Sequence, residues 1–148
     1  ASMQPSHAIS DLYFALDRLG LERLAGAYAW RSLLKSGATV CGGSDAPVEK
    51  GDPRIEYYAA THRHDLEGKA GSHWHLEQAL DRAQALALFT RNAAFAARRE
   101  GELGTLEVGK RADISVFEDD LTAVPPDRIL KTAPLMTMVD GIVRHDRL

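Results

Sequence analysis

The stretch that decides the fold is Ala38-Thr-Val-Cys-Gly-Gly-Ser-Asp-Ala-Pro47, in which a short apolar run passes through two glycines into a polar loop. The run 38–41 shows no alternation of apolar and polar residues, and it directly follows a segment with helical periodicity. An apolar strand without alternation is typical of a parallel sheet that is covered on both faces. The sequence therefore predicts an α/β fold in which residues 44–47 leave the carboxyl end of a parallel strand.

Helical segments flank this strand on both sides. Before it, residues 10–36 have apolar residues at helical spacing, with an interruption at Gly20 and an end at Gly37. After it, a proline suits the first turn of a helix over 53–65. Residues 76–99 are rich in alanine and predict a long helix that is bent or split part-way along.

The C-terminal third changes to a β pattern. Residues 112–117 and 135–139 alternate between apolar and polar side chains, which predicts two strands. Asp140-Gly141 between 135–139 and 142–144 is the two-residue signal of a β-hairpin. The order of elements predicts the end of an α/β domain, residues 1–100, followed by a small antiparallel unit, residues 101–148.

Composition excludes several functional classes. The 148 residues carry a net charge of −3, which predicts neither a nucleic acid nor a membrane as partner. There is one cysteine, so no internal disulfide is expected. No apolar run reaches the roughly 20 residues of a membrane span, and the N-terminus lacks the pattern of a signal peptide, so we expect a cytoplasmic protein. The chain begins with Ala1 and not with methionine, from which we expect it to be a piece of a longer protein.

The stretch Gly104-Thr-Leu-Glu-Val-Gly-Lys-Arg111 fits most of a phosphate-binding P-loop, and nucleotide binding is the weakest of our alternatives. A P-loop follows a strand, opens a helix and ends in Ser or Thr, whose hydroxyl holds magnesium. Here a predicted helix precedes the glycines, a predicted strand follows Lys110, and Arg111 replaces the hydroxyl residue. We therefore interpret the stretch as turns that lead into a strand.

Several motifs resemble the metal-dependent amidohydrolases. Gly42-Gly-Ser-Asp-Ala-Pro-Val-Glu49 resembles their G-S-D-A-P-x-E segment, and Gly104-x-Leu-x-x-Gly-Lys-x-Ala-Asp113 resembles a segment near their C-termini. Gln4-Pro-x-His7 and Tyr28-x-Trp-Arg-Ser-Leu33 look like the branch called amidohydrolase family 3. The block 85–94 is similar to its helix before the return strands. The resemblance covers nearly the whole chain, with the motifs in the family's order.

The resemblance implies a TIM-like (β/α)₈ barrel with a small β-sandwich. A complete barrel takes about 250 residues, so this chain cannot hold one. Aligned on the motifs, it would run from the end of strand 7 through helix 8 of the barrel and then supply strands of the sandwich. We therefore expect the C-terminal part of an enzyme that hydrolyses C–N bonds of amides, cyclic amides or N-acyl compounds.

Asp45 is the candidate catalytic residue and metal ligand. It follows a predicted strand, on the side of the barrel where active sites lie. A carboxylate there can bind a divalent metal such as zinc and accept a proton from the water that the metal activates. By the same resemblance, His7 lies past strand 7 and contacts the small-molecule substrate, with a surface histidine as the equal alternative. The resemblance leaves the role of Glu49 open.

Two further histidine pairs and the cysteine are not predicted to act in the chemistry. His62-Arg-His64 ends a predicted helix, and His73-Trp-His75 lies in a loop, so we interpret both pairs as solvated. Cys41 lies inside the predicted strand, where a buried core thiol is expected.

One metal-ligating carboxylate is too few, because a catalytic zinc normally has three protein ligands. We therefore expect the chain to be inactive by itself and the metal to belong to the full-length parent. The remaining alternative is a non-catalytic interaction module. Unpaired strand edges and an apolar face would then require a homo-oligomer or association with the rest of the barrel.

Overall fold

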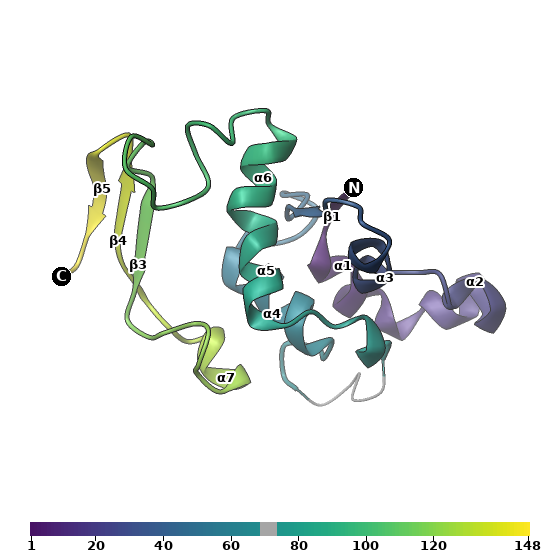
Figure 1. The fold of residues 1–148 in the computed structure, drawn as a ribbon. Helices are drawn as coiled ribbons and strands as arrows, with labels where there is room; N and C mark the ends of the chain where they lie inside the picture. Colours follow the sequence, from purple (N-terminus) through teal and green to yellow (C-terminus); the bar gives the residue numbers. More distant parts are fainter. Residues whose placement is uncertain (69–73) are drawn as a thin grey trace.

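The computed structural model describes residues 1–68 and 74–148 and has the predicted α/β composition. Helices and two short parallel strands form one part, and a three-stranded antiparallel sheet stands beside it (Figure 1). Within the described residues the strands do not close into a barrel. In chain order, the elements are β1 (Ser2–Met3), α1 (Pro5–Ser10), η1 (Asp11–Tyr13), α2 (Ala15–Leu24), α3 (Trp30–Lys35), β2 (Cys41–Gly42), α4 (Pro53–His62), η2 (Leu76–Gln78), α5 (Arg82–Phe89), α6 (Arg91–Ala96), β3 (Ile114–Phe117), α7 (Pro126–Ile129), β4 (Pro134–Val139) and β5 (Ile142–Asp146).

The parallel strand predicted from 38–41 is present, although it is shorter and begins later. β2 pairs in parallel with β1, with Ser2 opposite Cys41 and Met3 opposite Gly42. Helices α5 and α6 pack against β2, and the side-chain amide of Asn92 donates to the Val40 carbonyl at 2.8 Å. Val40 is fully buried. The helices thus cover Val40, as expected for an apolar residue of a parallel strand, whereas the neighbouring Thr39 is exposed.

The helical region before β2 differs from the prediction in its boundaries. Helix α1 already begins at Pro5, because proline suits the first turn of a helix. The interruption at Gly20 is confirmed, since its backbone is non-helical within α2. A second break separates α2 from α3, where Tyr28 has a positive φ of 52°. The helical region predicted over 10–36, with one interruption at Gly20, is therefore divided into more and shorter helices than expected.

The structure has helices within both later predicted segments, 53–65 and 76–99, but they are shorter than predicted. Helix α4 begins at Pro53, as predicted, but ends at His62 instead of residue 65, and the Asp52 carboxylate caps its start by accepting from the Arg54 backbone N–H. The long helix predicted over 76–99 is divided into η2, α5 and α6. The last break is at Thr90, whose φ and ψ are non-helical.

The core lies between α1, α3, α4 and α5. It is built from side chains far apart in the sequence, among them Trp30, Tyr57, Leu80 and Leu88. The connection around α7 packs back onto α4, because the guanidinium of Arg54 donates to the carbonyl of Thr132 at 2.7 Å. The sheet and the helical part are thereby held together.

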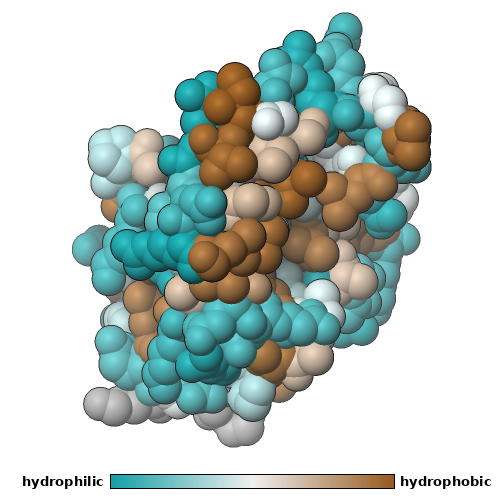
Figure 2. Space-filling model, turned by 90° about the vertical axis from the view of Figure 1, so that its left-hand side faces the viewer, coloured by the Kyte–Doolittle hydropathy of each residue, from teal (hydrophilic) through white to brown (hydrophobic). Residues whose placement is uncertain are grey.

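The antiparallel sheet has the order β3-β4-β5, and the predicted hairpin joins β4 to β5. Asp140 and Gly141 both have positive φ, 52° and 78°, as a two-residue hairpin of this type requires. The exposed apolar side chains at this end include Val139, Ile142 and Val143. Figure 2 faces this side of the molecule and shows apolar groups gathered across its middle.

The elements on either side of residues 104–111 are in the opposite order from those of a P-loop, as predicted. Helix α6 precedes it and β3 follows it. A side chain at Gly104, where φ is 90°, would come within 2.8 Å of the Arg91 Cα, so glycine is required by packing. The Lys110 ammonium is held within these turns, since it contacts Glu107 at 2.9 Å and donates to Thr105 at 2.6 Å. The stretch forms turns between the two parts.

Candidate active site at the ends of two parallel strands

The two predicted site residues lie just beyond the carboxyl ends of neighbouring strands. His7 is on the first turns of α1, which follows β1, and Asp45 is in the loop that follows β2. Because β1 and β2 are parallel and paired in register, their carboxyl ends share one edge. Residues separated by 38 positions in the sequence are thus brought to the same rim, as the sequence predicted.

The His7 imidazole and the Asp45 carboxylate face one another. His7 Nε2 is 3.6 Å from Asp45 Oδ2, which is too long for a hydrogen bond. Nε2 is itself buried and has no hydrogen-bond partner among the described residues. A buried nitrogen without a partner is costly, and its natural complement is a ligand atom placed between it and the carboxylate. The pair therefore suits a metal ion or a polar atom of a substrate.

The backbone presents the Asp45 carboxylate to the outside. Asp45 has a φ of 56°, in the left-handed region that aspartate tolerates better than most residues. Its side chain is 53% exposed, so the carboxylate is free to bind a ligand. Non-glycine residues in this region cluster at functional sites. Strand β2 and the turn at Asp45 together position this carboxylate.

A buried carboxylate behind the rim fixes the start of α1. Glu56 of α4 is 2% exposed and its Oε2 accepts from the backbone N–H of Ser6 at 2.8 Å. Burial raises the pKa of Glu56, and the hydrogen bond from Ser6 opposes that shift. The sequence analysis missed this residue, because its partner lies 50 positions away and no local pattern marks it. Glu56 orients the helix that carries His7.

Glu49, whose role was left open, also contacts α1. Its Oε1 accepts from the Ser10 hydroxyl at 2.8 Å. The loop that carries Asp45 is therefore tied to the helix that carries His7. Among the described residues, no group of three histidine, cysteine, aspartate or glutamate side chains converges to hold a metal ion. The described residues of the rim therefore do not form a complete metal site by themselves.

The other histidines and the cysteine do not join this rim as ligands. His62 is partly buried rather than solvated, and its ring stacks on Tyr58 with centroids 5.2 Å apart. His75 contacts Glu77 at 3.0 Å, and His73 lies outside the described residues. Cys41 is partly exposed, so the expectation of a buried core thiol is wrong. The thiol stands at the first residue of β2, where the covering by helices is incomplete.

The burial of His62 predicts a pH-dependent stability. Burial, with the Arg82 charge adding to it, lowers the pKa of His62 from 6.5 to about 4. The unfolded chain then binds the proton more tightly, so this contribution is fully present above pH 6.5 and is lost as the pH falls towards 4. We expect His62→Gln to reduce that loss by on the order of 1 kcal/mol, since partial solvent access screens the charge.

Urea unfolding of both proteins at pH 7 and pH 4.5 measures this difference. The opposing contribution of Glu56 is common to both proteins and cancels in the comparison. An equal loss of stability in the two proteins would show that His62 does not titrate in this way. His145→Gln is the matched control, since that ring lies in β5, far along the chain from His62.

Comparisons with known proteins identify the family. The model of the amidohydrolase family matches residues 1–145. The putative amidohydrolase YtcJ of Bacillus subtilis (strain 168) is 29% identical over 145 residues, which are 98% of this chain and 27% of that protein. The N-substituted formamide deformylase of Arthrobacter pascens is 32% identical over 117 residues, 79% of this chain and 21% of that enzyme.

A solved structure agrees with these relatives. An uncharacterized metal-dependent hydrolase from Pyrococcus horikoshii OT3 superposes with a TM-score of 0.74 and 31% identity, over 84% of this chain and 25% of that one. The chain thus spans about a quarter of the length of the relatives that it matches. None of the helices in the described residues is long and apolar enough to cross a membrane. The match over residues 1–145 establishes that the chain belongs to the amidohydrolase family.

Proposed function

We propose that this chain is the C-terminal part of a metal-dependent hydrolase that cleaves C–N bonds of amides, cyclic amides or N-acyl compounds. In this proposal residues 1–100 are the barrel from about strand 7 to helix 8, and residues 101–148 are strands of a small β-sandwich. The observation that carries it is the approach of His7 Nε2 and Asp45 Oδ2 to 3.6 Å at the carboxyl ends of two parallel strands. Active sites of barrel enzymes lie at that end.

The donor atoms at the rim fit a divalent metal such as zinc. Carboxylate oxygen is an accepted zinc ligand, and the exposed Asp45 carboxylate has no protein hydrogen bond to give up among the described contacts. When bound, such a metal polarises a carbonyl and activates water. Asp45 would hold the metal through one oxygen and take up a proton at its other oxygen. It would later return that proton to the leaving nitrogen.

His7 has a different task in this proposal. The His7 side chain is 31% exposed, and it would contact a polar atom of the small-molecule substrate and orient that atom over Asp45. Glu56 and Glu49 hold α1 and the loop in place, so that the two side chains keep their relative position. Holding the reacting groups in a fixed geometry is itself a large part of catalysis.

In this proposal the remaining metal ligands and strand neighbours come from the rest of the parent protein. Within residues 1–68 and 74–148, β1 and β2 form a sheet of two strands with unpaired outer edges, and the antiparallel sheet exposes apolar side chains (Figure 2). Such edges and faces are covered in stable proteins. We propose that the rest of the parent barrel covers them, with a second copy of the chain as the alternative.

Metal removal tests the proposed function. The reading frame upstream of this chain should encode a histidine-x-histidine motif after a strand. The full-length protein should hydrolyse N-formyl, N-acyl or cyclic amides, lose that activity on dialysis against a chelator, and regain it with zinc. The 148-residue chain alone should show no turnover, because it lacks the other ligands. Activity that survives the chelator, or robust turnover by the chain alone, would contradict the proposal.

A further inference from the structure

The sheet of β1 and β2 has one face that the helices cover and one that they leave open. Val40 and Gly42 point to the covered face, since Val40 is fully buried and a Cβ at Gly42 would collide with the Phe89 ring of α5. Side chains alternate between the two faces of a strand, so Cys41 and Gly43 belong to the open face. Cys41 is accordingly only partly buried.

Gln4 lies opposite Gly43 on this open face. Met3 pairs with Gly42, and the Gly43 backbone N–H donates to the Met3 carbonyl at 3.0 Å, so the pairing continues for one more residue. The side chain of Gln4 agrees with this register, because its Nε2 lies 4.0 Å from the point that a Gly43 Cβ would occupy. Apart from the chain neighbours of Gly43, no other heavy atom of the described residues is as near to that point. The Gln4 carboxamide therefore borders an open space above Gly43.

The Gln4 carboxamide makes no hydrogen bond within residues 1–68 and 74–148. Gln4 directly precedes α1, where a side chain commonly caps the helix, but its own side chain forms no such bond. A carboxamide has two N–H donors and a carbonyl acceptor, which complement the carbonyl and the N–H of another amide. The free carboxamide of Gln4 therefore suits a ligand of the amide class.

This open space adjoins the rim described above. The Gln4 carbonyl accepts from the His7 backbone N–H at 3.1 Å, so Gln4 belongs to the turn that leads into the helix of His7. Gly43 is two positions before Asp45 in the chain. An amide whose carbonyl lies between His7 and Asp45 would thus extend over Gly43, within reach of Gln4.

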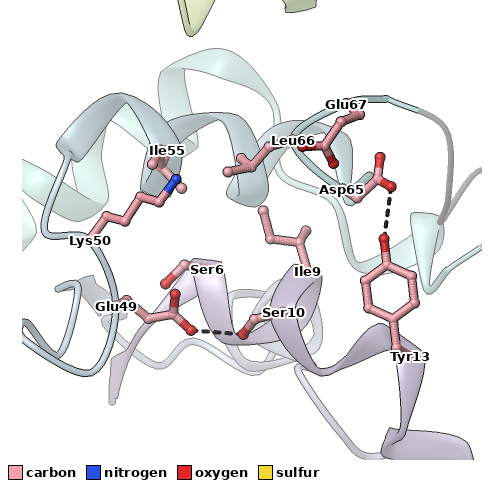
Figure 3. Close-up of a pocket in the computed structure, with 10 residues that line it drawn as sticks. All are labelled: Ser6, Ile9, Ser10, Tyr13, Glu49, Lys50, Ile55, Asp65, Leu66 and Glu67. Carbon is pink, nitrogen blue, oxygen red and sulfur yellow. Dashed lines mark hydrogen bonds between the residues drawn. The ribbon is translucent and has the colours of Figure 1, made fainter.

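The two segments that carry this space are fixed to one another. The Ser10 hydroxyl of α1 donates to Glu49 at 2.8 Å, and Figure 3 shows this bond between the helix and the loop that follows β2. At the other end of α1, the Ser6 backbone N–H donates to the buried carboxylate of Glu56. A ligand therefore meets groups that are already in position, which lowers the entropic cost of binding.

We propose that Gln4 and Gly43 form the acyl-group subsite of the hydrolase. The Gln4 Nε2 donates a hydrogen bond to the carbonyl oxygen of the amide substrate, which has a second lone pair for other partners. The acyl substituent lies over Gly43, where the missing side chain leaves room for it. This inference rests on the proposed function and adds to it that Gly43 sets the size of the acyl group that is accepted.

Binding to the metal-free full-length protein tests the role of Gln4 without hydrolysis. N-butylformamide is the probe, and NMR titration measures its dissociation constant. Gln4→Met keeps the length of the side chain and removes its donors, so the dissociation constant should rise about twofold to tenfold, as for one neutral hydrogen bond. The thermal midpoint should not change, because Gln4 makes no hydrogen bond in the described fold. A lower midpoint with unchanged binding would show a purely structural role and overturn the inference.

Gly43→Ala tests the size of the subsite. Alanine fits the fold here, since Gly43 does not have a left-handed φ and the added Cβ would make only an ordinary contact. The variant should weaken binding of N-butylacetamide at least about threefold more than binding of N-butylformamide, because the acetyl methyl needs the space that the new Cβ fills. Gly101→Ala, at another open position without a left-handed φ, is the matched control and should affect neither probe.

Binding and hydrolysis are measured separately, so that the two proposals can fail separately. An absence of saturable binding of N-butylformamide, an unchanged dissociation constant in Gln4→Met, or an equal effect of Gly43→Ala on both probes would each overturn this inference. If the metal-loaded protein binds the probes as expected but hydrolyses no amide, the failure lies with the proposed function.

Discussion

Asp45→Asn is expected to lower kcat/KM of the full-length hydrolase by about 10²–10⁴-fold, the range for removal of a general acid–base group. The amide occupies the same volume and tolerates the left-handed backbone at φ 56° at least as well, so the fold should be preserved. It cannot, however, accept and return a proton in the way that a carboxylate does. Steady-state kinetics on an N-acyl substrate, with the metal content measured for each protein, tests the prediction.

Asp17→Asn is the matched control for this substitution. Asp17 is an exposed aspartate in the first turn of α2, remote in sequence from both strands of the rim, and its replacement makes the same change in charge. We expect kcat/KM within about twofold of the unsubstituted protein, as is usual for exposed positions. If Asp45→Asn retained more than about a tenth of the activity, Asp45 would have no part in proton transfer.

Trp30→Ala is expected to lower the free energy of unfolding by about 3–5 kcal/mol, the usual cost of removing a buried tryptophan. Trp30 is 1% exposed and belongs to the main core cluster. The guanidinium carbon of Arg63 lies 4.1 Å from the centre of its ring, and Arg63 is itself fully buried. Burial lowers the pKa of Arg63 to about 10, so Arg63 remains charged at neutral pH. The alanine variant would leave a cavity beside a buried cation that has lost its aromatic neighbour.

Urea unfolding measures the loss, and a thermal melt should show a midpoint roughly 6–20 °C lower. Leu21→Ala, at a side chain that is 77% exposed, is the control and should change stability by less than about 0.5 kcal/mol. Trp30→Phe should cost much less than alanine, because it keeps a ring over Arg63 and removes a buried indole N–H that has no partner among the described residues. Equal losses in the alanine and phenylalanine variants would show that Arg63 does not depend on the ring.

Local signals in the sequence predicted most of the elements. A helix that begins at Pro53 and a hairpin at Asp140-Gly141 appear in the structure where expected, and a parallel strand is present at the end of the apolar run before Gly42. Helix starts and hairpin turns are predictable because they depend on a few neighbouring residues. The breaks at Tyr28 and Thr90 carry no such signal. There the helical pattern continues in the sequence, and packing against the core decides where each helix ends.

By itself the sequence determined the α/β order and the strand before Asp45, and the family resemblance implied a strand before His7. Parallel strands in one sheet present their carboxyl ends at one edge, so the two residues reach the same rim once these strands pair. Only the tertiary structure decided which side chains are buried, which is why the sequence did not predict Glu56 under α1 or Arg63 on the Trp30 ring. Burial depends on residues tens of positions away, and no local periodicity records those neighbours.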